Sequence, residues 1–142
     1  MVRERSVTTN YTAAATWLSR DATLLREQQR FPGADHLLGL AAECVLKSVL
    51  IGLGVTPEPD GNIKRQYRQH LPGLLSEFRN FSPNPYTQHF PPGKSLFDGW
   101  RVDDRYSECA HVDEARLQQH EADAQIIFAM FDEAIRQGHV QS

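Results

Sequence analysis

Three of the six histidines in the sequence follow an arginine at a separation of five or six residues. The pairs are Arg30 with His36, Arg65 with His70, and Arg105 with His111. Histidine exchanges protons near neutral pH, and the planar guanidinium of arginine matches the oxygens of a phosphate group. Metal-free cleavage of RNA needs both functions: a base for the 2′-hydroxyl proton and a donor for the developing phosphorane charge.

The acidic residues beside the third pair allow a second interpretation. Asp103, Asp104, Glu108 and His111 could surround a metal ion, because hard cations bind converging oxygen ligands. A solvated acidic loop explains the same residues more simply, and we expect neither a metal nor another cofactor. The sequence also lacks a phosphate-binding glycine loop, a Cys-x-x-Cys pair and a nucleophile elbow.

A polar stripe runs along the most apolar stretch of the chain, residues 34–51, which is predicted to form a central buried helix. His36, Glu43 and Lys47 fall within roughly 20° of one another at about 100° per residue. Glu43 and Lys47 are also an i, i+4 pair in the favourable order. The stripe is either a thin solvent-facing edge of a bundle or a polar seam that faces a cleft or a second subunit.

The elements that must position these side chains are predicted to be helices. Apolar residues recur at helical spacing, and no long run alternates with the period of a strand. The pattern predicts an all-α, antiparallel up-and-down bundle of four to five helices in one domain, residues 1–142. Helices are expected near 11–30, 34–51, 71–81 and 112–138, with a long irregular segment before the last one.

Composition narrows the function classes. A formal net charge of −3 and a pI of about 6.0 do not favour a strongly basic nucleic-acid binder, although a local basic patch remains open. Cys44 and Cys109 are too few for a disulfide scaffold. The charges within residues 34–51 argue against a membrane span, and the N-terminus has no apolar leader segment. We expect a soluble, cytoplasmic protein.

Three segments resemble the HEPN domain family (higher eukaryotes and prokaryotes nucleotide-binding). The stretch LLREQQRFPGADHLLGLAAECVLKSVL is similar to the first helical hairpin of that family. HLPGLL, at residues 70–75, resembles its histidine-leucine segment, and GWRVDDRYSE, at residues 99–108, a tryptophan and arginine-tyrosine segment of some members. In the second helix the matching positions are Ala34, His36, Leu37, Ala42, Glu43, Leu46 and Lys47.

The resemblance implies an all-α bundle that often forms a homodimer. Many members cut RNA without a metal through an Arg-x4–6-His motif, and some are toxins of toxin–antitoxin pairs with a nucleotidyltransferase-type partner protein. Arg105 and His111, just before the last helix, lie nearest to where active members carry the motif. Tyr106 departs from the pattern, because active members commonly have a polar residue after the arginine.

Two functions follow from this resemblance. The first is binding of RNA or a nucleotide, with metal-independent endoribonuclease activity carried by Arg105 and His111. The second is a catalytically silent dimeric module that docks a partner protein. In either case residues 99–108 are expected to fold over the polar stripe, with Glu43 paired to Arg101 or Arg105. Binding would then involve His36, Glu43, Lys47, Arg101, Asp104 and Tyr106.

Overall fold

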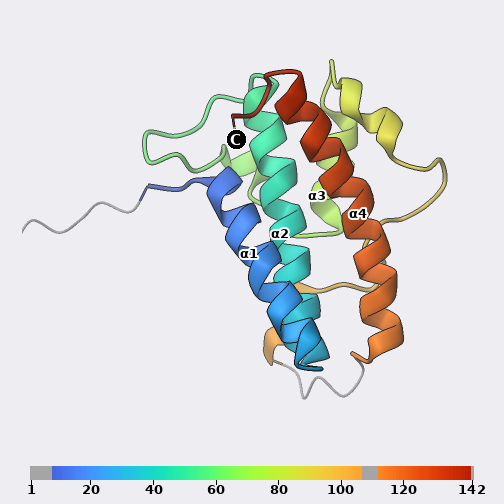
Figure 1. Ribbon diagram of the computed structural model, residues 1–142. Coiled ribbons are helices and arrows are strands. Elements are labelled where there is room, and N and C mark those ends of the chain that lie inside the picture. Colours follow the sequence, from blue (N-terminus) through green and yellow to red (C-terminus); the bar gives the residue numbers. More distant parts are fainter. Residues whose placement is uncertain (1–7, 107–111, 142) are drawn as a thin grey trace, which may run out of the picture.

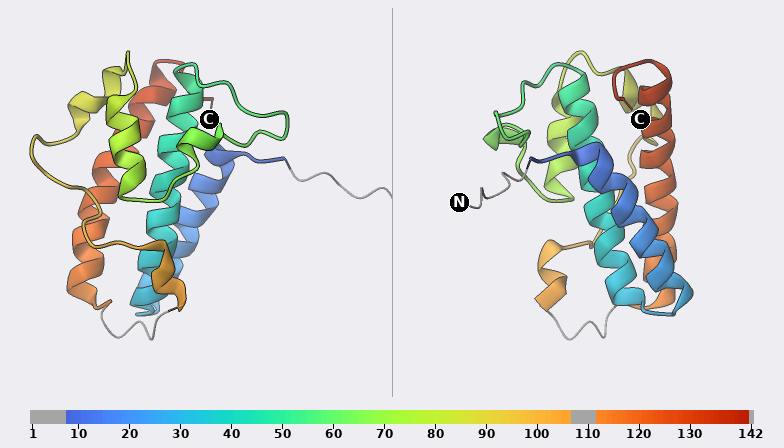
Figure 2. Two further views of the ribbon diagram at one scale, coloured as in Figure 1. Left: turned by 180° about the vertical axis from the view of Figure 1, so that it is seen from behind. Right: turned by 60° about the vertical axis from the view of Figure 1, so that its left-hand side comes forward.

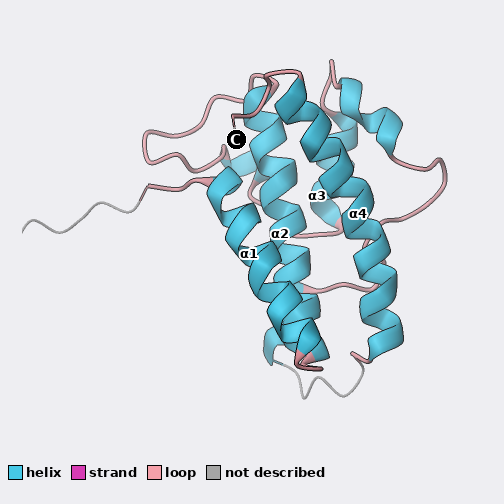
Figure 3. Cartoon of the chain, viewed as in Figure 1, coloured by secondary structure: helices cyan, strands magenta, loops and turns pink. Residues whose placement is uncertain are grey.

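The computed structural model describes residues 8–106 and 112–141 (Figure 1), and all regular structure among them is helical (Figure 3). This confirms the predicted all-α bundle. The helices are α1 (Tyr11–Glu27), α2 (Phe31–Gly52), α3 (Gly73–Asn80) and α4 (Glu114–Arg136), and three short 3-10 helices are η1 (Arg65–Tyr67), η2 (Pro85–His89) and η3 (Val102–Tyr106). No described helix combines the length and the apolar character that crossing a membrane requires.

Helices α1 and α2 form the predicted antiparallel hairpin, and the connection between them, residues 28–30, lies three residues earlier in the chain than predicted. The side chain of Asn10 caps α1 by accepting the backbone N–H of Ala13 at 3.0 Å. The helix ends at Glu27 rather than near Arg30, and Gln29 has a φ of 60° in the connection. α2 then starts three residues before its predicted beginning, because proline is favoured in the first helical turn.

α2 is the central helix of the bundle, as predicted. It lies between α1 on one side and α4 on the other, and both α2 and α4 run from bottom to top in Figure 1. Ala42, Val45 and Val49 are fully buried. Burial continues around most of the helix and includes two carboxylates, Asp35 and Glu43. Because a buried charge needs a partner, the neighbouring segments must supply one to each.

The long segment between α3 and α4 is irregular, as predicted, and large side chains hold it against the bundle. Its buried anchors are Tyr86, Phe90, Leu96, Phe97 and Trp100. Figure 2 shows this segment passing along one side of the molecule from the end of α3 toward η3. α4 then starts after Asp113, whose carboxylate accepts the backbone N–H of Arg116 at 2.9 Å. The chain therefore returns to the starting end of α2 before α4 begins.

Trp100 is the strongest of these anchors because α2 has a glycine beneath it. The indole is 1% exposed, and its Nε1–H donates to the carbonyl of Asp35 at 2.9 Å. A Cβ atom at Gly39 would lie 2.0 Å from the indole Cε2. The ring of His36 stacks nearly parallel to the Trp100 ring, with an interplanar angle of 9° and centroids 6.0 Å apart. Residues 99–102 therefore do fold onto α2, at the His36 end of the stripe.

Gly39→Ala is expected to destabilise the protein by about 1–3 kcal/mol, the usual cost of overpacking a close contact. The added methyl group would displace the indole of Trp100 and strain its bond to Asp35. Urea unfolding followed by circular dichroism measures the change. Gly33→Ala on the same helix is the matched control, because its methyl group meets only the flexible end of Leu25. An equal loss in both variants would contradict the role given to the Gly39 gap.

Candidate functional site

Glu43 anchors a carboxylate–histidine arrangement that reaches the surface of the protein. Its carboxylate is in the middle of α2 and the residue is 3% exposed. One oxygen accepts the backbone N–H of Leu71 at 2.8 Å. The two oxygens lie 3.2 and 3.1 Å from Nδ1 of His70. A buried carboxylate thus holds both a loop backbone and an imidazole.

One ring nitrogen of His70 is bound to Glu43, whereas about half of the side chain is in contact with solvent. Its side chain is 53% exposed although its Nδ1 meets a buried group. An ionised carboxylate can only accept, so the neutral ring carries its proton on Nδ1 and leaves Nε2 as an acceptor. A carboxylate that orients a histidine in this way is the arrangement of a general acid–base group. Among the three arginine–histidine pairs, the structure therefore gives this geometry to His70, whereas the sequence analysis favoured Arg105 and His111.

Two opposing influences act on the pKa of Glu43: the burial of its carboxylate, and the polar and charged groups that contact it. Burial raises the pKa of Glu43 above its ordinary value, while the Leu71 amide, the bonds to His70 and the charge of Lys47 lower it. The net direction is upward.

The segment that carries His70 is fixed to the bundle at several points. Ile63 is fully buried, and its backbone N–H donates to the Tyr11 hydroxyl at 3.0 Å. The carbonyl of Ile63 accepts Nε of Arg68 at 2.7 Å. Three cationic residues of this segment are exposed: Lys64, Arg65 and Arg68. Since residues 61–76 contain no acidic residue, the segment is locally basic in a chain whose net charge is negative.

The polar stripe on α2 is covered by three different segments. His36 stacks on Trp100, Glu43 meets His70 and Leu71, and the Nζ of Lys47 lies 5.7 Å from the ring centroid of Tyr11. The prediction that the stripe is a thin solvent-facing edge of the bundle is therefore wrong at Glu43, which is buried. The interpretation as a seam is closer, since the stripe faces other parts of the same chain.

The predicted pairing of Glu43 with Arg101 is wrong. Arg101 is exposed, and its guanidinium lies 3.9 Å from the carboxylate of Asp103. Trp100 enters the gap above Gly39, about one turn before Glu43, and the next residue is turned outward. The HLPGLL segment reaches Glu43 instead.

The arginine–histidine pair that the sequence analysis favoured, Arg105 with His111, lies largely outside the described part of the chain. His111 and the side chains of Arg105 and Tyr106 are beyond what the structure describes. Asp104 lies in η3, and its backbone N–H donates to the carbonyl of Arg101 at 3.1 Å. A catalytic role for Arg105 and His111 therefore stays a prediction. The described residues contain no group of three His, Cys, Asp or Glu side chains suited to a metal ion.

A second carboxylate–histidine pair is sealed in the core. Nδ1 of His120 lies 2.5 Å from Asp35, and Nε2 lies 3.0 Å from the carbonyl of Asp98. Both His120 and Asp35 are buried. His120 lies three residues after Leu117 and four before Ala124 on the apolar face of α4, and this spacing agrees with its burial. This pair joins α2 to α4.

The surroundings of His120 raise its pKa above the ordinary value of 6.5. Burial lowers the pKa, but the bond to Asp35, the bond to the Asp98 carbonyl and the charge of Asp35 raise it more, while the charge of Arg116 lowers it. Both ring nitrogens face acceptors, so both can donate when the ring is charged. Without access to solvent this pair cannot meet a substrate, and its role is structural.

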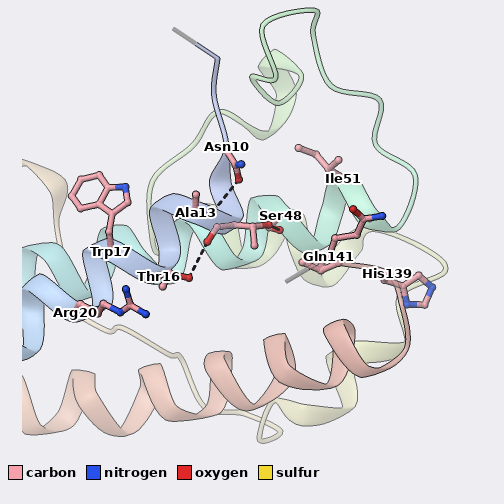
Figure 4. A pocket seen from close by; sticks show the side chains of 12 residues that line it. Asn10, Ala13, Thr16, Trp17, Arg20, Ser48, Ile51, His139 and Gln141 are labelled. Atoms are coloured by element: carbon pink, nitrogen blue, oxygen red, sulfur yellow. Dashed lines mark hydrogen bonds between the residues drawn. The ribbon is translucent and has the colours of Figure 1, made fainter.

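A separate hollow of about 650 Å³ lies where α1 passes the ends of α2 and α4 (Figure 4). It shares no residue with the Glu43–His70 site. Its polar lining includes Arg20, Ser48 and His139, and it has no acidic side chain. Nδ1 of His139 is hydrogen-bonded to the hydroxyl of Tyr86. Figure 4 shows Trp17 and Arg20 projecting from the same helix at the edge of this hollow.

Glu43→Ala is expected to lower the unfolding free energy by about 2–3 kcal/mol, because the buried N–H of Leu71 loses its acceptor and a cavity opens. A thermal melt measures the change. Glu27→Ala, at an exposed position, is the control and should stay within about 0.5 kcal/mol of wild type. Identical melts for both variants would show that Glu43 does not hold the loop.

The stability of the protein is expected to fall as the pH rises above about 6.5, the ordinary pKa of histidine. The folded-state pKa of His120 is raised, so its stabilising contribution is complete below the unfolded pKa and is lost through the folded pKa. Melting temperatures between pH 6 and pH 9 test this. His120→Gln should flatten the profile, whereas an unchanged slope in that variant would assign the dependence to other groups.

Comparison of the chain with family models, with curated proteins and with solved structures finds no match. The likeness to the HEPN family therefore rests on the three sequence segments quoted above. Two of these segments meet in the fold, because Glu43 of the central helix binds the first two residues of HLPGLL. The assignment of a function depends on the geometry of the site.

Proposed function

We propose that this protein is a HEPN-like domain that binds RNA and cleaves it without a metal, with His70 as the acid–base group. One observation carries the proposal: a half-exposed imidazole whose Nδ1 is held by a buried carboxylate. A histidine placed only for packing would not need an oriented, solvent-open Nε2. The exposed cations of residues 64–68 support the choice of an anionic substrate.

The proposed reaction uses Nε2 of His70, the ring nitrogen that is not bound to Glu43. Nε2 of His70 takes the proton of a ribose 2′-hydroxyl, and the oxygen attacks the adjacent phosphorus. The bond from phosphorus to the 5′ oxygen breaks, and that oxygen takes a proton from the imidazolium. The products are a 2′,3′-cyclic phosphate and a 5′-hydroxyl end. Glu43 stabilises the imidazolium between the two proton transfers.

Arg65 is the proposed donor to the phosphorane oxygens. It precedes His70 by five residues, which fits the Arg-x4–6-His spacing that the resemblance implies. It lies in η1 and is exposed, so its fork can turn toward a phosphate. Arg105 and His111 remain the alternative pair for the same reaction.

A different class of function is favoured by a different observation. Trp17 and Leu24 are exposed on α1, and large apolar groups on a surface are typical of protein interfaces. The chain would then be a catalytically silent module that docks a partner protein, for example one of nucleotidyltransferase type. Absence of RNA cleavage by the wild-type protein in every assay would favour this alternative.

His70→Ala is expected to reduce cleavage of a single-stranded RNA, with chelator present, by about 100-fold or more, the range for loss of an acid–base group. Glu43→Gln should also slow cleavage, because the imidazole loses its charged support. A fluorogenic RNA substrate and analysis of the product ends measure both effects. The fold should survive His70→Ala, since half of the side chain is in solvent.

His89→Ala is the matched control, because His89 lies in η2, outside the proposed site. It should cleave at the wild-type rate. His111→Ala separates the two candidate pairs. Loss of activity in His111→Ala with normal activity in His70→Ala would transfer the catalytic role to Arg105 and His111. Wild-type protein that neither binds nor cuts RNA would overturn the proposed function.

A further inference from the structure

A hollow of about 320 Å³ lies between α3 and residues 94–96 of the irregular segment, and we call it the α3 hollow. Its lining includes no acidic residue, and its polar side chains are two hydroxyl groups and two cations, which are Ser76, Ser95, Arg79 and Lys94. In the part of the chain that the structure describes, neither hydroxyl group makes a side-chain hydrogen bond. The α3 hollow is therefore lined by hydrogen-bond donors that suit an anion.

Both cations of the α3 hollow are held in place by other parts of the chain. Nη2 of Arg79 donates to the carbonyl of Lys94 at 3.3 Å, and its guanidinium carbon lies 5.2 Å from the ring centroid of Phe90. Nζ of Lys94 lies 3.2 Å from Oδ1 of Asp123, which is buried. Side chains that are already ordered lose little conformational entropy when they bind a ligand.

The positive charge of the α3 hollow comes mainly from Arg79. Asp123 offsets the charge of Lys94, whereas no carboxylate within the described residues pairs with Arg79. Arg79 uses one of its five N–H donors on the backbone, and the ammonium group of Lys94 has three N–H donors in all. Donors from both side chains therefore remain for a bound anion.

The α3 hollow begins next to the Glu43–His70 site. Its lining starts at Pro72, directly after the two residues that Glu43 binds, His70 and Leu71. In both views of Figure 2, η1 lies on one side of α3, and the irregular segment that follows η2 passes on the other. A strand of RNA with one phosphate at His70 can therefore reach the cations of η1 in one direction and the α3 hollow in the other.

We propose that the α3 hollow binds a backbone phosphate next to the one that reacts at His70. This role rests on the proposed function, and it makes the substrate an RNA strand with at least two phosphates rather than a dinucleotide. The guanidinium fork of Arg79 matches two phosphate oxygens, and Lys94 donates to a third. Binding of the second phosphate orients the strand so that a 2′-hydroxyl group lies at Nε2 of His70.

The number of phosphates in the substrate tests the site. The smallest substrate is a dinucleotide with one cleavable bond, and two trinucleotides carry an extra deoxynucleotide on the 5′ or the 3′ side of that bond. Wild type is expected to cleave at least one trinucleotide with a kcat/KM about 10-fold or more above that of the dinucleotide, the effect of a charge-assisted hydrogen bond. Arg79→Gln should remove this advantage for one trinucleotide and leave the dinucleotide rate unchanged.

Two further variants accompany Arg79→Gln. Ser76→Asp places a carboxylate in the α3 hollow and should have the same effect, and an acidic residue near the start of α3 suits the helix dipole. Arg20→Gln, on α1 in the separate hollow of Figure 4, is the matched control and should leave all rates unchanged. Lys94 is less suitable, because its loss would leave the buried carboxylate of Asp123 unpaired. Thermal melts check that each variant is folded.

Binding of a 2′-deoxy oligonucleotide, which cannot be cleaved, separates the phosphate site from the reaction. Arg79→Gln should reduce the slope of log affinity against log salt concentration by about 0.7, the value for one phosphate contact on a single strand. An unchanged slope, with wild-type rates of Arg79→Gln on all three substrates, would overturn the phosphate site and leave the proposed function in place.

Failure of the proposed function gives a different result. Wild type that binds the deoxy strand with the expected slope change in Arg79→Gln, but cuts no substrate, would overturn the reaction and support the phosphate site. Wild type that neither binds the deoxy strand nor cuts RNA would overturn both.

Discussion

Two carboxylates are buried in α2, and the need to pair them fixes where several other segments pack. A helix enclosed on nearly all sides cannot leave Asp35 and Glu43 to water, and an unpaired buried charge costs several kcal/mol. Each carboxylate therefore engages a distant segment. Asp35 meets His120 of α4, while Glu43 meets the loop at His70 and Leu71. The polar groups of the core thus determine how the chain is arranged around its apolar helix.

The same pairing of a carboxylate with a histidine has two different consequences. The pair made by Asp35 is closed on all sides, so its imidazole can only join two helices. The pair made by Glu43 is closed at the carboxylate and open at the imidazole. Exposure, rather than the type of residue, separates a structural histidine from one that can meet a substrate. This difference supports His70 as the functional group.

α1 is the least enclosed of the three long helices, and its first residue supports the segment that carries His70. Its Tyr11 supports the segment that carries His70 through the backbone of Ile63. Its outer face leaves Trp17 and Leu24 in solvent.

The sequence by itself determined the class of fold, the hairpin of the first two helices and the central place of residues 34–51, because helical periodicity and local breaks are properties of neighbouring residues. It also marked Glu43 as a charge that needs a partner, and three arginine–histidine pairs of suitable spacing. Only the tertiary structure selected His70 as that partner and excluded Arg101. The reason is physical: contacts between segments far apart in the chain depend on how irregular loops close over the core, and here the gap above Gly39 receives Trp100 and turns Arg101 away. The burial of His120 was readable from its spacing on α4, whereas its bond to Asp35 required the packing of two helices.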